Sequence, residues 1–482
     1  MRSLTGEQLA GVAVVMIGSF VAALDASIVS TVMPTVVGEL GGIDRYALVF
    51  SAYLLVSTIA TPICGRLADI FGRTPIYVAG MAVFVAGSVG AGLSADMNQL
   101  IVSRALQGLG SGALLPVGMT IIGDLFDARG RARIQPVFST MWLGGALIGP
   151  AVGGVLTQAF SWRWAFLVNL PVGIVAIAVL VFVFHETRRG MDEPIDWTGA
   201  ALLTLASGGL LLALNGVAPL AGAVAVIVGL PLFLRAERTS AHPLFDVALM
   251  RDPAIGPGLL LNGFVGVMTL AVSTYLPPFV QGVLGRTPIE AGVVVLATSV
   301  GWSSGAVVIA FFLAHLGPRR TALLGTLCWA VGSAILVGLD RTSALPLAVV
   351  AAAILGLGMG LTVFPVLVAA QSAVGWSRRG VVTGVVDFSR SMGAAIGVAA
   401  LGTVLFATMG ASAADVQTLL DTVRRGELGP ERAAVTADAL ATGLRSVYLI
   451  MIAVAVVGAL LAHRLPEALR DQAAQPDAVP VA

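Results

Sequence analysis

The sequence predicts an all-α polytopic membrane protein with fourteen transmembrane helices, arranged as two six-helix bundles plus two inserted helices. The first observation is composition: 57% of the 482 residues are hydrophobic and 11% are charged, with a mean hydropathy of +0.95. Soluble domains carry about 25% charged residues. The other observations are a series of apolar segments of membrane-spanning length and an internal repeat that relates the two halves of the chain.

Apolar segments follow one another along the chain with short polar breaks between them. A helix needs about 20 apolar residues to cross the hydrocarbon core of a bilayer, and most of these segments approach or exceed that length. The predicted spans are residues 9–32, 46–64, 76–94, 98–122, 135–157, 165–184, 197–216, 219–234, 255–276, 290–313, 321–339, 346–370, 381–408 and 443–462.

The arginines predict how these helices are oriented. All 27 basic residues are arginine, and 17 of them fall on the side of the N-terminus when the spans alternate, against 7 on the other side. Because positive loops favour the cytoplasm, both termini are predicted to be cytoplasmic. The absence of lysine favours a bacterial source, so the predicted location is the bacterial cytoplasmic (inner) membrane. No signal-peptide pattern opens the chain, so the first helix is expected to be retained.

The internal repeat divides the chain into two parallel halves. Gly145 and Gly149 recur as Gly393 and Gly397 at an offset of 248 residues, and other matched positions have nearly the same offset. Two halves around a central pathway are typical of alternating access, in which rigid bundles rock about a midplane site. The predicted domains are an N-terminal bundle (1–190), two inserted helices with a cytoplasmic linker (191–250), and a C-terminal bundle (251–482) with an external hairpin at about 409–442.

Asp25 lies well inside the first apolar segment. An ionised carboxylate there costs roughly 2.5 to 3.5 kcal/mol on insertion scales unless it is paired, protonated or facing water. Acids inside a membrane mark ion pathways, so we predict that Asp25 carries the coupling proton. Arg104 lies at a similar depth in the fourth segment, and its planar guanidinium suits a carboxylate. We expect the two to meet, either in proton transfer or as a static ion pair.

The segment from Gly65 to Arg73 falls in the predicted cytoplasmic loop between the second and third helices. Its glycines permit a tight turn, and its acidic and basic residues can bind neighbouring helix ends. The segment resembles the signature loop of the major facilitator superfamily, which implies a latch that breaks during gating. Thr74-Pro75 departs from the basic residues usual at that place, which implies a weaker latch. The candidate gating residues here are Gly65, Arg66, Asp69, Gly72 and Arg73.

Further segments extend this resemblance. The stretch from Arg104 to Gly112 resembles the fourth-helix motif of the superfamily, whose arginine is implicated in proton transfer. The glycine-rich fifth helix lets helices approach closely and resembles the motif of antiporters in the superfamily. With the stretch from Trp162 to Pro171, these features resemble the fourteen-helix drug:proton antiporter branch, the multidrug efflux transporters. The resemblance adds to the gating set Gly145, Gly149, Pro150, Gly153 and Gly154.

Asp387 and Arg390 place two charges in the thirteenth predicted helix, where the branch commonly has Asn at the first position. At a spacing of i, i+3 they can neutralise each other on one helix face. The alternative is a role in binding a cationic substrate or a second proton, so Asp387 joins Asp25 and Arg104 as a candidate for proton coupling.

The long external connection predicts a hairpin. Leu419 and Leu420 belong to an apolar set at helical spacing, and Gly426 and Gly429 interrupt it. Pro430 is placed to start a second short helix.

A wide apolar cavity is expected between the bundles, with aromatic, methionine and polar side chains on its walls. The candidate lining residues are Phe20, Asn262, Phe264, Met268, Tyr275, Gln281, Trp302, Phe364 and Arg390. Two cysteines and four scattered histidines offer neither a disulfide framework nor a metal site. The sequence has no nucleotide-binding motif, so we expect no cofactor beyond the proton as coupling ion, and no nucleic acid partner.

These features predict a secondary active transporter, not an enzyme: a proton-coupled antiporter that exports hydrophobic, often cationic drugs and thereby confers antibiotic resistance. Its expected partners are hydrophobic small molecules, protons and membrane lipids; the oligomeric state is left open. A dedicated exporter of one natural product, siderophore or lipid is the alternative. A non-transporting membrane sensor or scaffold is a different class, which the buried charges disfavour because such a protein need not retain them.

Overall fold

The computed structural model describes residues 6–125, 128–183, 196–214, 218–240, 252, 255–374, 379–410, 412–421 and 424–467. Within these residues the chain is helical and has no β-strand, which confirms the all-α class. Thirteen helical segments are long and apolar enough to cross a membrane. Helix α5 (Ala128–Ala159), with 32 residues, completes the predicted fourteen.

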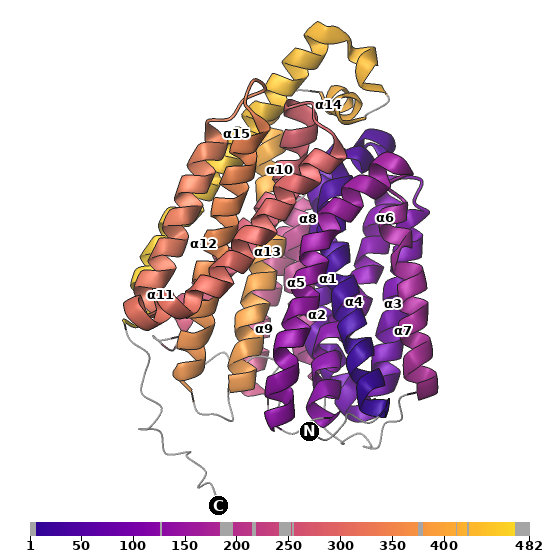
Figure 1. Ribbon diagram of the computed structural model, residues 1–482, viewed down its shortest axis with the longest axis vertical. Coiled ribbons are helices and arrows are strands. Elements are labelled where there is room, and N and C mark those ends of the chain that lie inside the picture. Colours follow the sequence, from indigo (N-terminus) through magenta and orange to yellow (C-terminus); the bar gives the residue numbers. More distant parts are fainter. Residues whose placement is uncertain are drawn as a thin grey trace, which may run out of the picture.

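The N-terminal half forms one group of helices, on the right in Figure 1. Its transmembrane elements are α1 (Gly6–Leu40), α2 (Tyr46–Phe71), α3 (Arg73–Gly92), α4 (Met97–Leu125), α5, and a sixth span made of α6 (Trp164–Leu167) and α7 (Asn169–Val183). A short 3-10 helix, η1 (Ile43–Arg45), joins α1 to α2. The inserted helices are α8 (Trp197–Leu214) and α9 (Pro219–Thr239).

The C-terminal half forms the second group, on the left in Figure 1. Its elements are α10 (Gly256–Pro278) with the π-helical turn η3 (Phe279–Val283), α11 (Pro288–Val337), α12 (Leu345–Ser372), α13 (Arg379–Met409), α14 (Ala413–Leu420), η5 (Arg424–Leu428) and α15 (Gly429–His463). Helix α11 holds two of the predicted spans, because the chain turns at Gly317, whose φ of +72° suits glycine. Pro318 follows and starts the second span.

The glycine repeat is visible as matching helix contacts in the two halves. A Cβ at Gly145 of α5 would lie 2.6 Å from the carbonyl oxygen of Phe20 in α1. A Cβ at Gly393 of α13 would lie 2.1 Å from the carbonyl oxygen of Gly263 in α10. Glycine therefore lets the backbones of equivalent helix pairs touch in both halves.

The halves meet near the end of the molecule that carries α14, opposite the start of α1 (Figure 1). The Tyr46 hydroxyl donates to the Thr274 carbonyl (2.6 Å), and the Gln281 side-chain amide donates to the Thr31 carbonyl (3.0 Å). The α14 side chain Gln417 donates to the Gly38 carbonyl at the end of α1 (3.3 Å). These polar contacts join α1 and α2 to the C-terminal half.

The inserted helices pack against the seam between the two halves. Leu203 of α8 and Phe233 of α9 share an apolar cluster with Leu55 and Ile59 of α2 and with Ala399 of α13. The pair α8–α9 therefore touches both bundles, a position that follows from apolar faces on helices otherwise surrounded by lipid.

Two local expectations were wrong. The segment predicted as a loop after Gly65 is helical, because α2 continues through Phe71 and only Gly72 separates it from α3. The second short helix of the external hairpin is not separate: the helix that begins at Gly429 runs without a break to His463. In both cases the end of an apolar segment marks where the chain leaves the bilayer, and polar residues there continue the helix.

Candidate functional site

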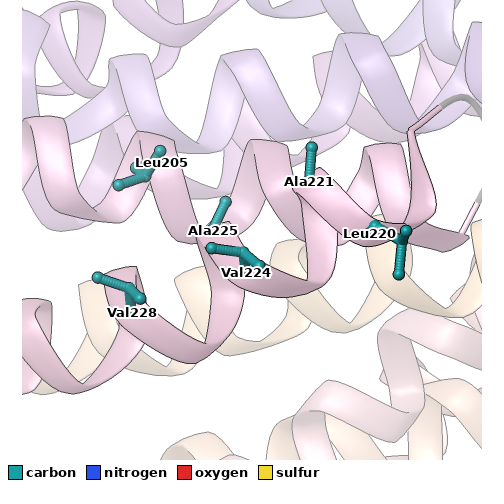
Figure 2. Close-up of a pocket in the computed structure, with 6 residues that line it drawn as sticks. All are labelled: Leu205, Leu220, Ala221, Val224, Ala225 and Val228. Carbon is teal, nitrogen blue, oxygen red and sulfur yellow. The ribbon is translucent and has the colours of Figure 1, made fainter.

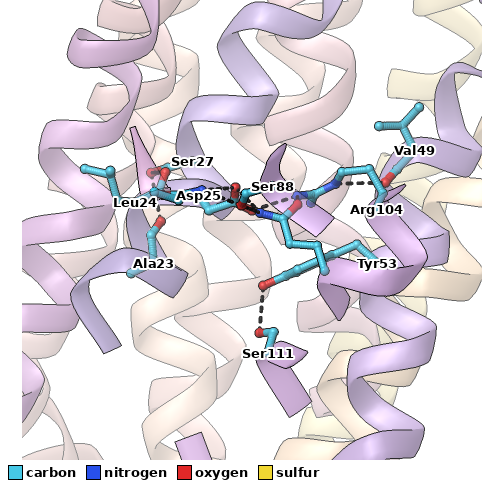
Figure 3. A network of polar contacts seen from close by, with 11 residues as sticks. Ala23, Leu24, Asp25, Ser27, Val49, Tyr53, Ser88, Arg104 and Ser111 are labelled. Carbon is cyan, nitrogen blue, oxygen red and sulfur yellow. Dashed lines mark hydrogen bonds and ion pairs between the residues drawn. The ribbon is translucent and has the colours of Figure 1, made fainter. Parts of the chain in front are cut away.

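The site is a buried polar cluster inside the N-terminal half, made of Asp25, Ser88, Arg104, Gln107 and Asn169, which we call the Asp25 network. All five residues are at most 1% exposed. They come from α1, α3, α4 and α7, so four helices must pack correctly for the cluster to form. Figure 3 shows Asp25, Ser88 and Arg104 meeting between the helices.

The ion pair predicted at this depth is present. Arg104 Nη1 donates to Asp25 Oδ2 at 2.7 Å, and the same nitrogen donates to Gln107 Oε1 at 2.5 Å. Gln107 lies three residues after Arg104 on α4, so both side chains share one helix face. The guanidinium also lies 4.1 Å from the centroid of the Tyr53 ring, and Arg104 Nε donates to the Val49 carbonyl. A buried cation is thus surrounded by a carboxylate, two oxygens and a π face.

Two side-chain amides complete the coordination of the carboxylate. Gln107 Nε2 donates to Asp25 Oδ1 at 2.7 Å, and Asn169 Nδ2 donates to the same oxygen at 3.0 Å. Both amides also donate to Ser88 Oγ, at 2.6 and 3.1 Å. Asp25 therefore accepts three hydrogen bonds, one from a charged guanidinium and two from neutral amides.

Asn169 lies where the sixth span is interrupted. Helix α6 ends at Leu167 and α7 begins at Asn169. Pro171 has no N–H to donate to the carbonyl of Leu167, which is the bond a continuous helix would require. Val168 between the two helices keeps a right-handed helical conformation, so the span continues in one direction, and Asn169 is the first residue of α7, beside Asp25.

Glycines of α5 hold the segment of α1 around Asp25 close. Cβ atoms at Gly149 and Gly153 would lie 1.9 Å from Ser27 Oγ and 3.1 Å from the Ile28 carbonyl oxygen. The Ser27 hydroxyl in turn donates to the Gly145 carbonyl at 3.2 Å. The predicted close approach of helices at this motif is therefore confirmed.

The same helix also contacts the other half. A Cβ at Gly154 would lie 2.8 Å from Ile289 Cα, and one at Gly292 would lie 2.4 Å from the Pro150 carbonyl oxygen. Both partners belong to the start of α11. Helix α5 thus uses one set of glycine contacts within its bundle and another between the bundles.

The predicted latch residues lie at the C-terminal end of α2 and the start of α3. Asp69 and Arg73 approach to 3.8 Å across the junction between α2 and α3, and Gly72 has a φ of +95°. Gly65 has open space where a Cβ would project, and Arg66 is helical within α2. Asp69 and Arg73 belong to the N-terminal half, so this ion pair does not join the two bundles.

Asp387 and Arg390 pair with each other on α13, at 2.5 Å, as their spacing predicted. The Asp387 side chain is 63% exposed and the Arg390 side chain is 30% exposed. The pair lies on α13 of the C-terminal half, and its carboxylate is exposed, unlike that of Asp25.

Three of the predicted cavity residues do not line an open cavity. Met268 and Tyr275 are completely buried, and the Tyr275 hydroxyl donates to the Val398 carbonyl. Asn262 is 1% exposed and its amide donates to the Val386 carbonyl. All three are packed among other helices, and the Tyr275 ring lies 6.4 Å from the Tyr46 ring of α2, where the halves meet. Residue type alone does not say which helix face a side chain occupies. Gln281 instead joins the halves.

The other predicted lining residues are partly buried: Phe20, Phe264, Trp302 and Phe364. Two apolar surface grooves are present. One, of about 410 Å³, lies between α5 and α11 and includes Leu147, Ser303 and Ser304. The other, of about 470 Å³, lies between α8 and α9, as Figure 2 shows. Its wall is entirely aliphatic, so it offers no group for proton chemistry.

Sequence reasoning missed part of the network. Ser88, Gln107, Asn169 and Tyr53 were not singled out as site residues, although Gln107 and Asn169 lie within the segments that carried the resemblance. The available signal was a neutral polar side chain inside an apolar span. Within the described residues, no group of three His, Cys, Asp or Glu side chains is placed to hold a metal ion.

The comparisons with known proteins agree with this architecture. The model of the Major Facilitator Superfamily matches residues 15–398. Multidrug transporter protein MdtP of Bacillus subtilis (strain 168) is 33% identical over 413 residues, which is 82% of this chain and 75% of that protein. Multidrug resistance protein 3 of the same strain is 28% identical over 398 residues, covering 81% of this chain and 78% of that protein.

A solved structure shares the fold. The crystal structure of a bacterial homologue of the human lysosomal transporter Spinster, in an inward-facing and unoccupied conformation, superposes with a TM-score of 0.69. The match covers 96% of this chain and 98% of that one, at 16% sequence identity. At that identity the likeness concerns the fold alone.

Proposed function

The chain belongs to the Major Facilitator Superfamily of membrane transporters, and from this membership we propose that it exports hydrophobic, often cationic compounds in exchange for protons. Relatives named as multidrug transporters support the export of small molecules. Proton exchange is supported by one observation above all: a carboxylate, Asp25, buried within a membrane-spanning helix and held by Arg104.

The proposed mechanism is competition between proton and substrate. When the pathway opens to the outside, Asp25 takes up a proton and its attraction to Arg104 weakens. The loaded carrier reorients inward, and substrate binding then favours release of the proton to the cytoplasm. Return with substrate completes the cycle. Because Asp25 is sealed in this structure, proton access requires that the helices around it separate, which links protonation to conformation.

We place the start of α1 and the end of α15 on the cytoplasmic side, and α14 outside, of a bacterial cytoplasmic membrane. The distribution of arginine supports this orientation. The polar contacts at the α14 end would then close the outer side, and outward opening would break them.

Asp387 is the second acid in this scheme. Its exposed carboxylate suits attraction of a cationic substrate, whereas its partner Arg390 keeps the local charge balanced when the substrate is absent. We assign it to substrate attraction, because the Asp387 side chain is 63% exposed whereas that of Asp25 is completely buried.

The test is proton release from inverted vesicles that hold a preset pH gradient. Lipophilic cations are added to wild type, Asp25→Asn and the control Glu290→Gln at matched expression. Glu290 is a carboxylate of a helix capping box, outside the network, and Gln can keep that cap. We expect substrate-dependent loss of the gradient in wild type and control, and none in Asp25→Asn. Equal activity in all three would refute coupling through Asp25. No response to any cation would favour a dedicated exporter of a neutral or lipid compound.

A further inference from the structure

Asn169 is the one member of the Asp25 network with an unused polar atom. Its Nδ2 donates to Asp25 and to Ser88, at 3.0 and 3.1 Å. Its Oδ1 is buried and has no hydrogen-bond partner among the described residues. An unsatisfied buried carbonyl oxygen is costly, and each such atom in a folded protein calls for an explanation.

The ionised carboxylate explains the amide orientation. Asp25 Oδ1 accepts from Gln107 and from Asn169, so both amides must present N–H groups to it. With Asn169 turned over, two oxygens would face each other beside a negative charge. The orientation observed is therefore the one that an ionised Asp25 selects, and it leaves Asn169 Oδ1 on the side without a partner.

Protonation reverses the requirement, because a carboxylic acid must donate its new O–H. Asp25 Oδ2 faces the Arg104 guanidinium, a group with donors only, so the proton resides on Oδ1. Gln107 presents its Nε2, not its Oε1, to Asp25 Oδ1, and turning this amide over would break the contact of Oε1 with Arg104 at 2.5 Å. Ser88 Oγ makes no bond to Asp25 and already receives both amides.

Among the residues that the structure describes, the groups around Asp25 leave one candidate acceptor, Asn169 Oδ1. Arg104 is the charged group that faces it, and Tyr53 is the titratable one; the Tyr53 hydroxyl is bonded to Ser111 at 2.8 Å. Helices α3 and α7 contribute the neutral Ser88 and Asn169, and α5 contributes glycine backbone. A carbonyl oxygen accepts two hydrogen bonds, so a turned Asn169 would receive both the Asp25 O–H and the Ser88 O–H.

We propose that Asn169 is a two-state positioning residue whose side-chain amide turns over when Asp25 gains or loses its proton. With Asp25 ionised, the amide donates; with Asp25 protonated, it accepts. This inference rests on the proposed function, since it requires that Asp25 be protonated during the cycle. The turn changes no covalent bond, and it exchanges a donor for an acceptor in front of Asp25 Oδ1 at the start of α7.

The direct test is infrared difference spectroscopy on the full-length protein in lipid, between mildly alkaline and mildly acidic buffer. Asparagine labelled with ¹³C in its side-chain carbonyl is well suited, because the chain contains only four asparagines. We expect a carboxylic acid band that Asp25→Asn removes, and a labelled amide band that shifts with it. In Asn169→Leu the labelled shift should vanish, and the acid band should move to higher frequency because its O–H has lost its acceptor.

Rescue separates this role from mere packing. A serine hydroxyl both donates and accepts, so Asn169→Ser should retain substrate-driven proton release, whereas Asn169→Leu should slow it by roughly fivefold or more, the effect of losing a hydrogen bond of about 1 kcal/mol. The outcomes are distinguishable. An acid band without any labelled amide shift overturns the two-state role and leaves proton coupling intact. The absence of an acid band assignable to Asp25 overturns the proposed function itself. If Asn169→Leu fails to fold, the labelled wild-type spectrum and Asn169→Ser still decide.

Discussion

The buried ion pair permits a quantitative prediction through a double-mutant cycle of Asp25→Asn and Arg104→Gln. Two unit charges 2.7 Å apart, at an effective dielectric constant of about 20, attract by about 6 kcal/mol. An asparagine at position 25 keeps one hydrogen bond from Arg104, worth about 1.5–3 kcal/mol. The single variant Asp25→Asn should therefore lose about 3–4.5 kcal/mol of stability, in the range expected when one partner of a buried pair is removed.

The double variant should be less damaged than the two single variants together, because neither charge is then left unpaired. We expect a coupling energy of about 3 kcal/mol. The assay is denaturant unfolding in mixed micelles, followed by loss of helicity, for wild type, both single variants and the double variant.

The matched control is the exposed pair Asp415–Arg432, which has a similar separation of 2.9 Å. Its cycle, with Asp415→Asn and Arg432→Gln, should give no more than about 1 kcal/mol because water screens the charges. Equal coupling energies for the two pairs would refute the reasoning, since burial would then contribute nothing.

Three further predictions concern packing, gating and pH. Gly149→Ala should destabilise the fold by about 1–3 kcal/mol and reduce transport, because its Cβ would lie 1.9 Å from a side-chain oxygen of α1; Gly208→Ala, with nothing within 4 Å, is the unfolding control. Gln281→Leu removes the hydrogen bond to the Thr31 carbonyl, worth about 1 kcal/mol, and should raise the population of molecules open at the α14 end by roughly fivefold. Spin-label distances between α1 and η3 measure this population, and unchanged distances would argue against a gating contact. Hydrogen bonds, first from the Thr342 hydroxyl, lower the pKa of Asp340 below its ordinary value of 3.8. The ionised Asp340 should therefore stabilise the fold above pH 3.8, and this stabilisation should be lost as the pH falls through the lower pKa of the folded state. The loss of stability caused by Asp340→Asn should become smaller over the same fall in pH. A loss of stability that stays constant with pH would contradict this.

The sequence was sufficient to predict the ion pair because charge inside a membrane is so restrictive. Asp25 and Arg104 each require a partner, and both lie at a similar depth in their helices. The glycines of α5 were predictable for a related reason: their spacing of four residues allows backbone contact along one helix face.

The neutral part of the network could not be derived in the same way. Serine, asparagine and glutamine are common within transmembrane helices, where they find partners at modest energetic cost. Nothing in the spacing of Ser88 and Asn169 shows that α3 and α7 bring them to the same carboxylate. That information arises only from the packing of the helices.

The predicted cavity residues depend on side-chain orientation, which residue type does not give. Met268 and Tyr275 are large and apolar, which suits a cavity wall and a bundle interior equally well. The hydrophobic pattern could not separate these faces, because a helix in lipid is apolar on all sides.

The two glycine faces of α5 have a practical consequence for genetic analysis. One helix carries contacts within the N-terminal bundle, through Gly145 and Gly149, and contacts with the C-terminal half, through Pro150 and Gly154. Under the proposed mechanism we expect the first set to persist and the second to be exchanged. A saturation scan along this single helix should therefore divide into two phenotypes by angular position: low protein abundance on one face, and normal abundance with altered turnover on the other. The border between these two classes would map the line along which the moving halves of the carrier separate.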